Sequence, residues 1–333
     1  MTRANRDDVA RLAGVSTAVV SYVINNGPRP VAQATRERVL AAMDELSYRP
    51  NASARALKLA RTSVIGLLMS DITNPFFSEF AMFLQGQAHA RGYGLMIANT
   101  RQENAEETAE LQSMLARGVD GIAVYGARRP ETLSAIVRSG VRAVSMDWHL
   151  TASDVPSIGI DDYGATTQAV EHLLGHGHSE VAFIAGTDDL TLRVRAWSDT
   201  MRTRCTPERL AQLRVTGDFT REGGYDAATT LLELPDPPRA IFVSTDVQAF
   251  GALAAVRDLG LSVPADVAIV SFDGTNASAF TSPPLTAIRI PQDRIAQLCI
   301  EKLTSVPSAE PMHSTFPHEL VIRESCGCHP RSM

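Results

Sequence analysis

From Ser63 onward, short apolar runs alternate with amphipathic stretches, and this alternation limits the possible fold more than any other feature of the chain. A parallel strand buried on both faces needs an unbroken apolar run, and its parallel neighbour must be reached through a crossover helix. The first runs lie at 64–69, 94–98, 121–124 and 143–146, with helices expected at 78–91, 103–117 and 131–139. This pattern predicts an open, doubly wound parallel sheet.

A second series of apolar runs predicts a second lobe of the same construction. These runs lie at 181–184, 214–216, 241–244, 267–272 and 285–290. Ligands of open α/β sheets bind beyond the carboxyl ends of the strands. The loops expected there carry acids, one arginine and several aromatics, which suit a small polar molecule. Taken singly, Asp71 and Asp246 are equally well interpreted as caps of the helices that follow them.

The same alternation occurs in nucleotide-binding enzymes, but the motifs of such enzymes are missing. No Gly-x-Gly-x-x-Gly follows the first strand, and the chain has no Walker A sequence. No nucleophile elbow is recognisable either. His176 and His178 lie in a helix-to-strand turn, where we interpret them as polar loop residues. We therefore expect neither an enzyme nor a bound cofactor.

The first 49 residues predict three short helices. Residues 6–13 form a helix with Val9, Leu12 and Ala13 expected inside, and Gly14 then supplies a tight turn. Ser16 can cap a second helix over 17–25. A third helix over 32–46 is expected to bury Val39, Leu40, Met43 and Leu46. Two helices joined by a glycine turn are typical of a helix-turn-helix, whose second helix enters the major groove of DNA.

Charge supports this division of the chain. Residues 1–61 carry ten Lys and Arg against five Asp and Glu, whereas residues 62–333 carry 21 against 32. A basic head on an acidic body indicates that the head meets a polyanion. The alternative is ordinary scatter of surface charge.

Compartment and metal content follow from what the sequence lacks. The N-terminus has no apolar run of the kind found in secretory signals, and no run is long enough to cross a membrane, so we expect a cytoplasmic protein. Four cysteines are too few for a disulfide framework. Cys326-Gly-Cys328-His329 has no second ligand pair at zinc spacing, so no metal site is expected.

Linked motifs in the head resemble a known family. They are Asp8-Val9-Ala10-Arg11-Leu12-Ala13-Gly14-Val15-Ser16, Val20-Ser21, Ile24-Asn25, Thr35-Arg36-Glu37-Arg38-Val39 and Tyr48-Arg49-Pro50-Asn51. Together they closely resemble the lactose-repressor (LacI/GalR) family. The resemblance continues through Asp71–Phe77, Asp161–Ala165, Leu173–His178, Val181–Gly186 and the Arg-Glu-Ser-Cys-Gly ending at 323–327, and so covers nearly the whole chain.

The resemblance implies a homodimer whose heads bind a palindromic operator. Residues 51–58 would form a hinge helix, and Leu57 would be wedged into the minor groove. Thr17, Ala18 and Tyr22 match the base-reading positions. Many members have Arg or His where Tyr22 stands, and Tyr cannot make the bidentate guanine contact of Arg. The full set of expected DNA-contacting residues is Ser16, Thr17, Ala18, Ser21, Tyr22, Asn25, Tyr48, Asn51, Ala54, Leu57 and Lys58.

In the body, the resemblance implies a small-molecule effector between two Rossmann-like lobes of the periplasmic-binding-protein type. Arg193 matches the effector-clamping arginine. The other expected contacts are Asp71, Phe76, Phe77, Asp147, Phe219, Thr245, Asp246 and Asp273. Thr245 replaces a common Asn and Trp148 a common Arg, so the effector is not fixed by the family. We expect a sugar ahead of a purine or another metabolite, as inducer or corepressor.

The expected organisation has five parts. They are a DNA-binding head at 1–49, a hinge and linker at 50–61, a first lobe at 62–161 plus 291–323, a second lobe at 162–290, and a tail at 324–333. No leucine heptad for a tetramer is present, which favours a dimer. A two-lobed sugar receptor without a regulatory role is the remote alternative, against which the head argues.

Overall fold

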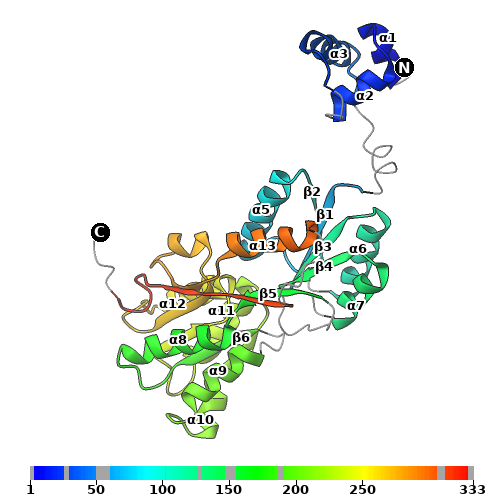
Figure 1. Cartoon of the computed structure of the whole chain (residues 1–333). Coiled ribbons are helices and arrows are strands. Elements are labelled where there is room, and N and C mark those ends of the chain that lie inside the picture. Colours follow the sequence, from blue (N-terminus) through cyan, green and yellow to red (C-terminus); the bar gives the residue numbers. More distant parts are fainter. Residues whose placement is uncertain are drawn as a thin grey trace. The chain divides into compact units, whose positions relative to one another are not determined.

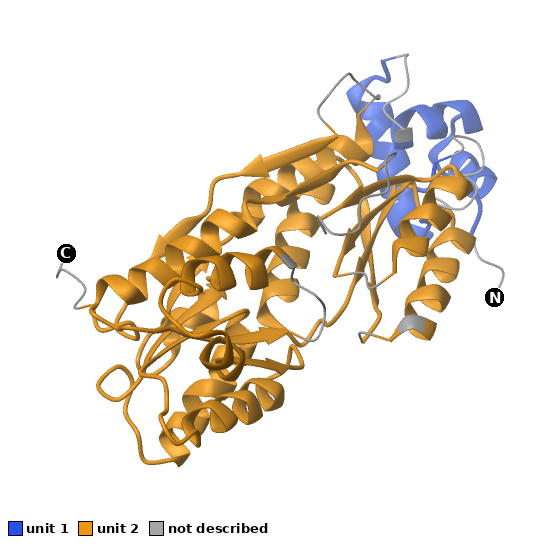
Figure 2. Ribbon diagram, turned by 90° about the horizontal axis from the view of Figure 1, so that it is seen from below, with its two compact units in different colours: residues 1–62 blue, residues 63–333 orange. Residues whose placement is uncertain are grey.

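The computed structural model describes residues 4–25, 30–49, 61–101, 103–126, 129–146, 155–186, 191–305 and 312–328. The chain divides into two compact units, residues 1–62 and residues 63–333 (Figure 2). No helix in these ranges is both long and apolar enough to cross a bilayer.

Among the described residues of the first unit there are three helices, α1 (Arg6–Ala13), α2 (Thr17–Asn25) and α3 (Gln33–Glu45) (Figure 1). Asn5 caps α1: its side chain accepts from the backbone of Asp7 and Asp8, and the Asp8 carboxylate accepts from the backbone of Asn5. Gly14 ends α1 in the left-handed conformation, with φ of 64°. These local signals produce the helix-turn-helix that the sequence predicts.

The core of the first unit is built on small residues. Its buried apolar residues are Val9, Ala10, Ala13, Val20, Val23, Val39, Ala42 and Tyr48. The prediction that Leu12 and Leu40 face inward is wrong, because each side chain is 47% exposed. Close packing of α1 on α3 through alanines turns both leucines toward solvent.

The second unit contains two six-stranded sheets. The first sheet has the order β11-β5-β4-β3-β1-β2 and is parallel throughout. Its strands are β1 (Val64–Met69), β2 (Gly94–Asn99), β3 (Gly121–Tyr125), β4 (Arg142–Ser145), β5 (Ser157–Ile160) and β11 (His313–Phe316). Its helices are α5 (Pro75–Ala90), α6 (Asn104–Ala116), α7 (Pro130–Ser139) and α13 (Gln292–Thr304).

The second sheet has the order β12-β10-β9-β8-β6-β7. Its strands are β6 (Ala182–Gly186), β7 (Arg214–Gly217), β8 (Ala240–Val243), β9 (Ala268–Asp273), β10 (Thr286–Arg289) and β12 (Glu319–Val321). Its helices are α8 (Asp162–Gly175), α9 (Thr191–Met201), α10 (Pro207–Gln212), α11 (Arg221–Leu232), α12 (Asp246–Asp258) and the 3₁₀ helix η1 (Asn276–Phe280). Two lobes of the predicted doubly wound type are therefore present.

The chain passes between the lobes three times: after β5, after β10, and between β11 and β12. The last passage differs from the expected boundary at 323. β12 pairs antiparallel with β10, so residues 319–321 belong to the second sheet and not to the first lobe. β5 is also absent from the predicted strands, because Ser157-Ile158-Gly159-Ile160 is short and half of it is small residues.

Glycines set the closest helix contact of the second lobe, where α11 lies against α12. A β-carbon on Gly251 would overlap the carbonyl oxygen of Arg221. By contrast, a β-carbon on Gly86 of α5 would meet no atom within 4 Å.

Gly251→Ala is therefore expected to destabilise the protein by about 1–3 kcal/mol, because the two helices must separate. Gly86→Ala is the matched control and is expected to be neutral or to stabilise by up to about 1 kcal/mol, because alanine favours helix. Urea unfolding of the full chain measures both. Equal stability of the two variants would contradict the close contact of α11 and α12.

Candidate functional site

The exposed face of α2 carries the predicted DNA-reading residues. Ser16, Thr17 and Ala18 are exposed, and Ser21 and Tyr22 are partly exposed. Val20 and Val23, on the opposite face, are buried in the core of the head. The helix thus presents mostly small or polar side chains outward, an arrangement that lets its backbone approach base edges and phosphates.

Tyr48 differs from the other predicted DNA contacts. Its side chain is only 9% exposed and belongs to the core of the head, so its ring has a packing role. The side chain of Asn25 lies outside the described residues. So do Asn51, Ala54, Leu57 and Lys58 of the predicted hinge helix.

In the body, Arg193 of α9 is held in place from three sides. Its Nε donates to the Asp162 carboxylate at 2.8 Å, and its Nη1 donates to the Ser244 carbonyl at 2.7 Å. The guanidinium carbon lies 3.5 Å from the centre of the Phe272 ring. An arginine fixed by an ion pair, a carbonyl and a ring face is pre-organised to bind a polar ligand.

Two buried acids lie in the adjoining strand ends of the second sheet. Asp246, at the start of α12, is fully buried, and it accepts from the Ser271 hydroxyl at 2.5 Å and from the Thr275 backbone and hydroxyl at 2.7 Å each. Asp273, at the end of β9, accepts from the Asp246 backbone at 3.1 Å. Asp246 is therefore a bonded structural group, and Thr245 rather than Asp246 caps α12.

Burial makes both acids hard to ionise, and the charge of Asp246 adds to this effect at Asp273. Burial raises the pKa of Asp246 to about 6, against the opposing effect of the hydrogen bonds from Ser271 and Thr275. Burial, and next the charge of Asp246, raise the pKa of Asp273 well above its ordinary value, while Arg193 opposes this shift. Asp273 thus resists ionisation, and it lies close enough to Arg193 for the two charges to interact.

Thr245 and Phe219 complete the second-lobe part of the predicted site. The Thr245 hydroxyl accepts from the Gln248 backbone at 3.3 Å and donates to the Gln248 side chain at 2.9 Å, so it acts as a cap. Phe219 is partly exposed, and its ring lies against the backbone of Gly186, where a β-carbon would overlap the ring. Gly186 therefore provides the space that Phe219 occupies.

The first lobe contributes aromatic side chains at the carboxyl end of its sheet. Phe77 is half-buried, and its ring meets the ring of Tyr125 edge to face, with centroids 5.5 Å apart. Phe76 packs on the same tyrosine at 5.1 Å but is buried in the core. Asp71 accepts from the backbone and hydroxyl of Thr73 at 2.8 Å each and forms a turn, while Asn74 caps α5.

The structure thus brings together some, but not all, of the effector-binding residues predicted from the sequence. Arg193, Asp246 and Asp273 lie within one network, whereas Asp147 lies outside the described residues. Asp162, Phe272 and Tyr125 were missed. Sequence position could have indicated two of the three, because Phe272 directly precedes Asp273 and Tyr125 ends a strand of the first sheet.

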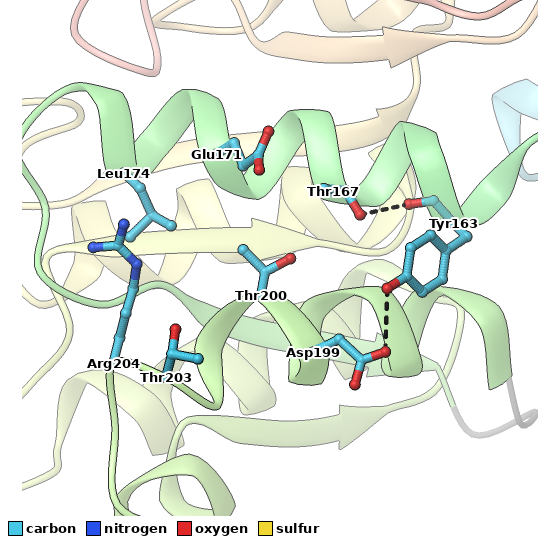
Figure 3. A pocket seen from close by; sticks show the side chains of 8 residues that line it. All are labelled: Tyr163, Thr167, Glu171, Leu174, Asp199, Thr200, Thr203 and Arg204. Atoms are coloured by element: carbon cyan, nitrogen blue, oxygen red, sulfur yellow. Dashed lines mark hydrogen bonds between the residues drawn. The ribbon is translucent and has the colours of Figure 1, made fainter.

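A separate hollow of about 320 Å³ lies between α8 and α9 (Figure 3). Tyr163 donates to Asp199 across it at 3.1 Å, and the Thr167 hydroxyl donates to the Tyr163 carbonyl at 2.9 Å. None of the sequence-predicted effector residues that the structure describes lines this hollow, so we do not assign the effector to it.

Asp273→Asn tests the strained pair of acids. The raised pKa means that the folded state disfavours the charged form, so stability falls as pH rises from about 4 through the raised pKa. The variant should therefore gain about 1–3 kcal/mol at pH 8 by thermal or urea unfolding, and the gain should shrink toward pH 4.

Asparagine can still accept from the Asp246 backbone and tolerates the φ of 104° at this position. The exposed acid Asp218 gives the control variant Asp218→Asn, for which no gain is expected. Loss of stability in Asp273→Asn at every pH would contradict the strain.

Comparisons with known proteins agree with this geometry. Residues 7–51 match the family model for bacterial regulatory proteins of the lacI family, and residues 170–326 match the periplasmic binding protein-like domain. Catabolite control protein A of Priestia megaterium is 34% identical over 96% of this chain and 98% of its own length. The ribose operon repressor of Escherichia coli K12 is 36% identical over 90% of this chain and 92% of its own.

Two solved structures share the whole architecture. The lac repressor dimer bound to operator and an anti-inducer superposes with a TM-score of 0.81 at 28% identity, covering 98% of this chain and 99% of that one. The complex of the transcriptional regulator CelR with cellobiose superposes with a TM-score of 0.70 at 28% identity, covering 97% of this chain and 100% of that one. The chain belongs to the lacI family of bacterial regulatory proteins, as a DNA-binding transcriptional repressor with a small-molecule effector.

Proposed function

We propose that this repressor binds a palindromic operator as a homodimer and that a sugar, bound at Arg193 between the lobes, sets its affinity for DNA. The observation that carries the proposal is the Arg193 cluster itself. An arginine fixed by Asp162, the Ser244 carbonyl and the Phe272 ring stands at the carboxyl ends of the strands, where open sheets bind ligands.

The residues around Arg193 fit a sugar. A sugar offers hydroxyl groups to charged acceptors and donors, and an apolar face to aromatic rings. Arg193 supplies a charged donor, the carboxyl group of Asp273 supplies a polar partner, and Phe77 and Phe219 supply partly exposed rings. The similarity to a cellobiose complex and to a ribose operon repressor supports the same ligand class. A purine is the alternative, since the ring of Phe219 would also stack on a base.

A closing motion of the lobes is the proposed link to DNA. One hydrogen bond joins the lobes near the site: the Asn276 backbone of η1 donates to the Glu79 carboxylate of α5 at 2.9 Å. An effector that favours one degree of closure shifts the population of the DNA-competent dimer. The role requires no catalytic step, and Asp246, bonded on three sides, is not placed as a general base.

The remaining elements of the proposal follow the family. The heads of the two protomers would read successive major grooves through α2, with residues 51–58 as the hinge and Leu57 as the wedge. The protein would work in the cytoplasm, where its DNA is. Whether the effector acts as inducer or corepressor is decided by the sign of its effect on operator binding.

Arg193→Ala tests the effector site. A thermal-shift screen of pentoses, hexoses, disaccharides, purine bases and nucleosides identifies the ligand, because a bound ligand raises Tm by mass action. Arg193→Ala removes a charged partner of that ligand. Its affinity for the ligand, measured by titration calorimetry, should fall by about tenfold to a hundredfold, while operator binding remains.

Arg195→Ala is the matched control, because its side chain is on the same helix but 71% exposed. If Arg193→Ala and the wild type bind the effector with equal affinity, the effector binds elsewhere. A screen in which only purines raise Tm would favour the alternative ligand.

Tyr22→Ala tests the reading of DNA. We expect specific operator affinity to fall about tenfold or more in a gel-shift titration, because a base contact contributes roughly 1–3 kcal/mol. Non-specific binding should stay the same, since it depends on phosphate contacts. Leu40→Ala, exposed on α3, is the control and should bind as wild type. An unchanged operator affinity in Tyr22→Ala would remove Tyr22 from the reading surface.

A further inference from the structure

Four side chains of the metal-binding type converge at the end of α8, away from the effector site. They are His172, His176, Cys326 and Cys328, and their ligand atoms all lie within 4.8 Å of one another. The Cys328 sulfur lies 3.1 Å from His176 Nε2 and 3.8 Å from His172 Nε2. The two segments are about 150 residues apart in the chain, so the fold itself assembles the cluster.

The histidines are presented by helical spacing. His172 lies in the last turn of α8 and His176 is its C-cap, so the two side chains share one face. Their ring centroids are 4.8 Å apart, with the planes at 76°. This spacing of four residues on a helix lets two imidazoles bind one metal ion.

The cysteines are presented by a pinned turn. The Ser325 backbone donates to the Pro284 carbonyl at 3.1 Å, and the Gly327 backbone donates to the Glu324 carbonyl at 3.0 Å. Gly327 has φ of 93°, a conformation that an L side chain rarely adopts, and it turns the chain between the cysteines. Cys326 is 1% exposed and Cys328 partly exposed, and both are free thiols.

The donor set selects the metal. Two thiolates and two imidazoles suit zinc, which takes four such ligands in a tetrahedron. Bond lengths of about 2.0–2.3 Å imply ligand atoms roughly 3.3–3.8 Å apart in such a site. The distances from the Cys328 sulfur to the two histidine nitrogens, 3.1 and 3.8 Å, already fall near this range.

We propose that His172, His176, Cys326 and Cys328 form a zinc site that fastens the C-terminal segment to α8 of the second lobe. Spacing alone failed to predict it, because the second ligand pair lies on a helix far from the Cys-x-Cys sequence. His176 is a ligand in this proposal and not only a polar loop residue. The site does not depend on the effector or on DNA.

The proposed role is structural. Residues 324–328 follow β12, the antiparallel edge strand of the second sheet, and α8 covers the same lobe. A metal bridge between them would hold the end of the chain against the lobe that carries Arg193. Because zinc would then bind the folded state and not the unfolded chain, its addition would raise Tm.

The test uses the full chain without a polyhistidine tag, kept reduced and freed of metal with a chelator. Zinc chloride is added, free metal is removed by gel filtration, and bound zinc is measured by inductively coupled plasma mass spectrometry. We expect about one zinc per chain and a rise in Tm. Titration with cobalt chloride should give sulfur-to-cobalt charge-transfer absorption and the visible bands of a tetrahedral site.

Cys328→Ser and His176→Gln should each lower the affinity for zinc by about tenfold or more and abolish the rise in Tm. The matched controls are Cys205→Ser and His178→Gln, whose side chains lie outside the cluster, and both should bind zinc as wild type does. No zinc bound to the reduced protein would overturn the proposal. Equal binding by all four variants, or a native Cys326–Cys328 disulfide found by intact mass, would overturn it as well.

Discussion

The ion pair between Arg193 and Asp162 is the interaction on which the proposed effector site depends. Asp162 is the first residue of α8, where the chain first enters the second lobe, and Arg193 belongs to the next helix, α9. Both side chains are mostly buried, with exposed fractions of 18% and 13%. A buried pair is not in itself strong evidence of stability, but removal of either partner leaves an uncompensated charge. The pair therefore fixes the position of the Arg193 guanidinium, the cation to which a ligand would bind.

The acids beside this pair support the proposal that this site binds a ligand at some cost in stability. Asp246 and Asp273 are both buried, burial raises the pKa of each, and the charge of Asp246 raises the pKa of Asp273 further. A sequence optimised for stability alone would place neutral or apolar groups here. Perturbed acids next to a fixed arginine, in loops at strand ends, are typical of functional sites.

Much of this structure could be predicted from the sequence, and the failures have physical reasons. The parallel strands and the helix-turn-helix were predicted because apolar period and capping act locally. Leu12 and Leu40 were misplaced because close packing through alanines, which no periodicity reveals, rotated their faces outward. β12 was assigned to the wrong lobe because its partner, β10, is distant in sequence. Tertiary contact likewise gathers His172 with Cys328 and aims Asp162 at Arg193.

The central claim is that one small molecule and one operator are coupled through this chain. Two pairs of dissociation constants test it most directly: the Kd of the effector for the free and for the operator-bound protein, and the Kd of the operator without and with effector. Linkage requires both ratios to be the same factor, which we expect to be about fivefold to 150-fold. Equal effector affinity for free and operator-bound protein would contradict the account, however tightly each ligand binds alone.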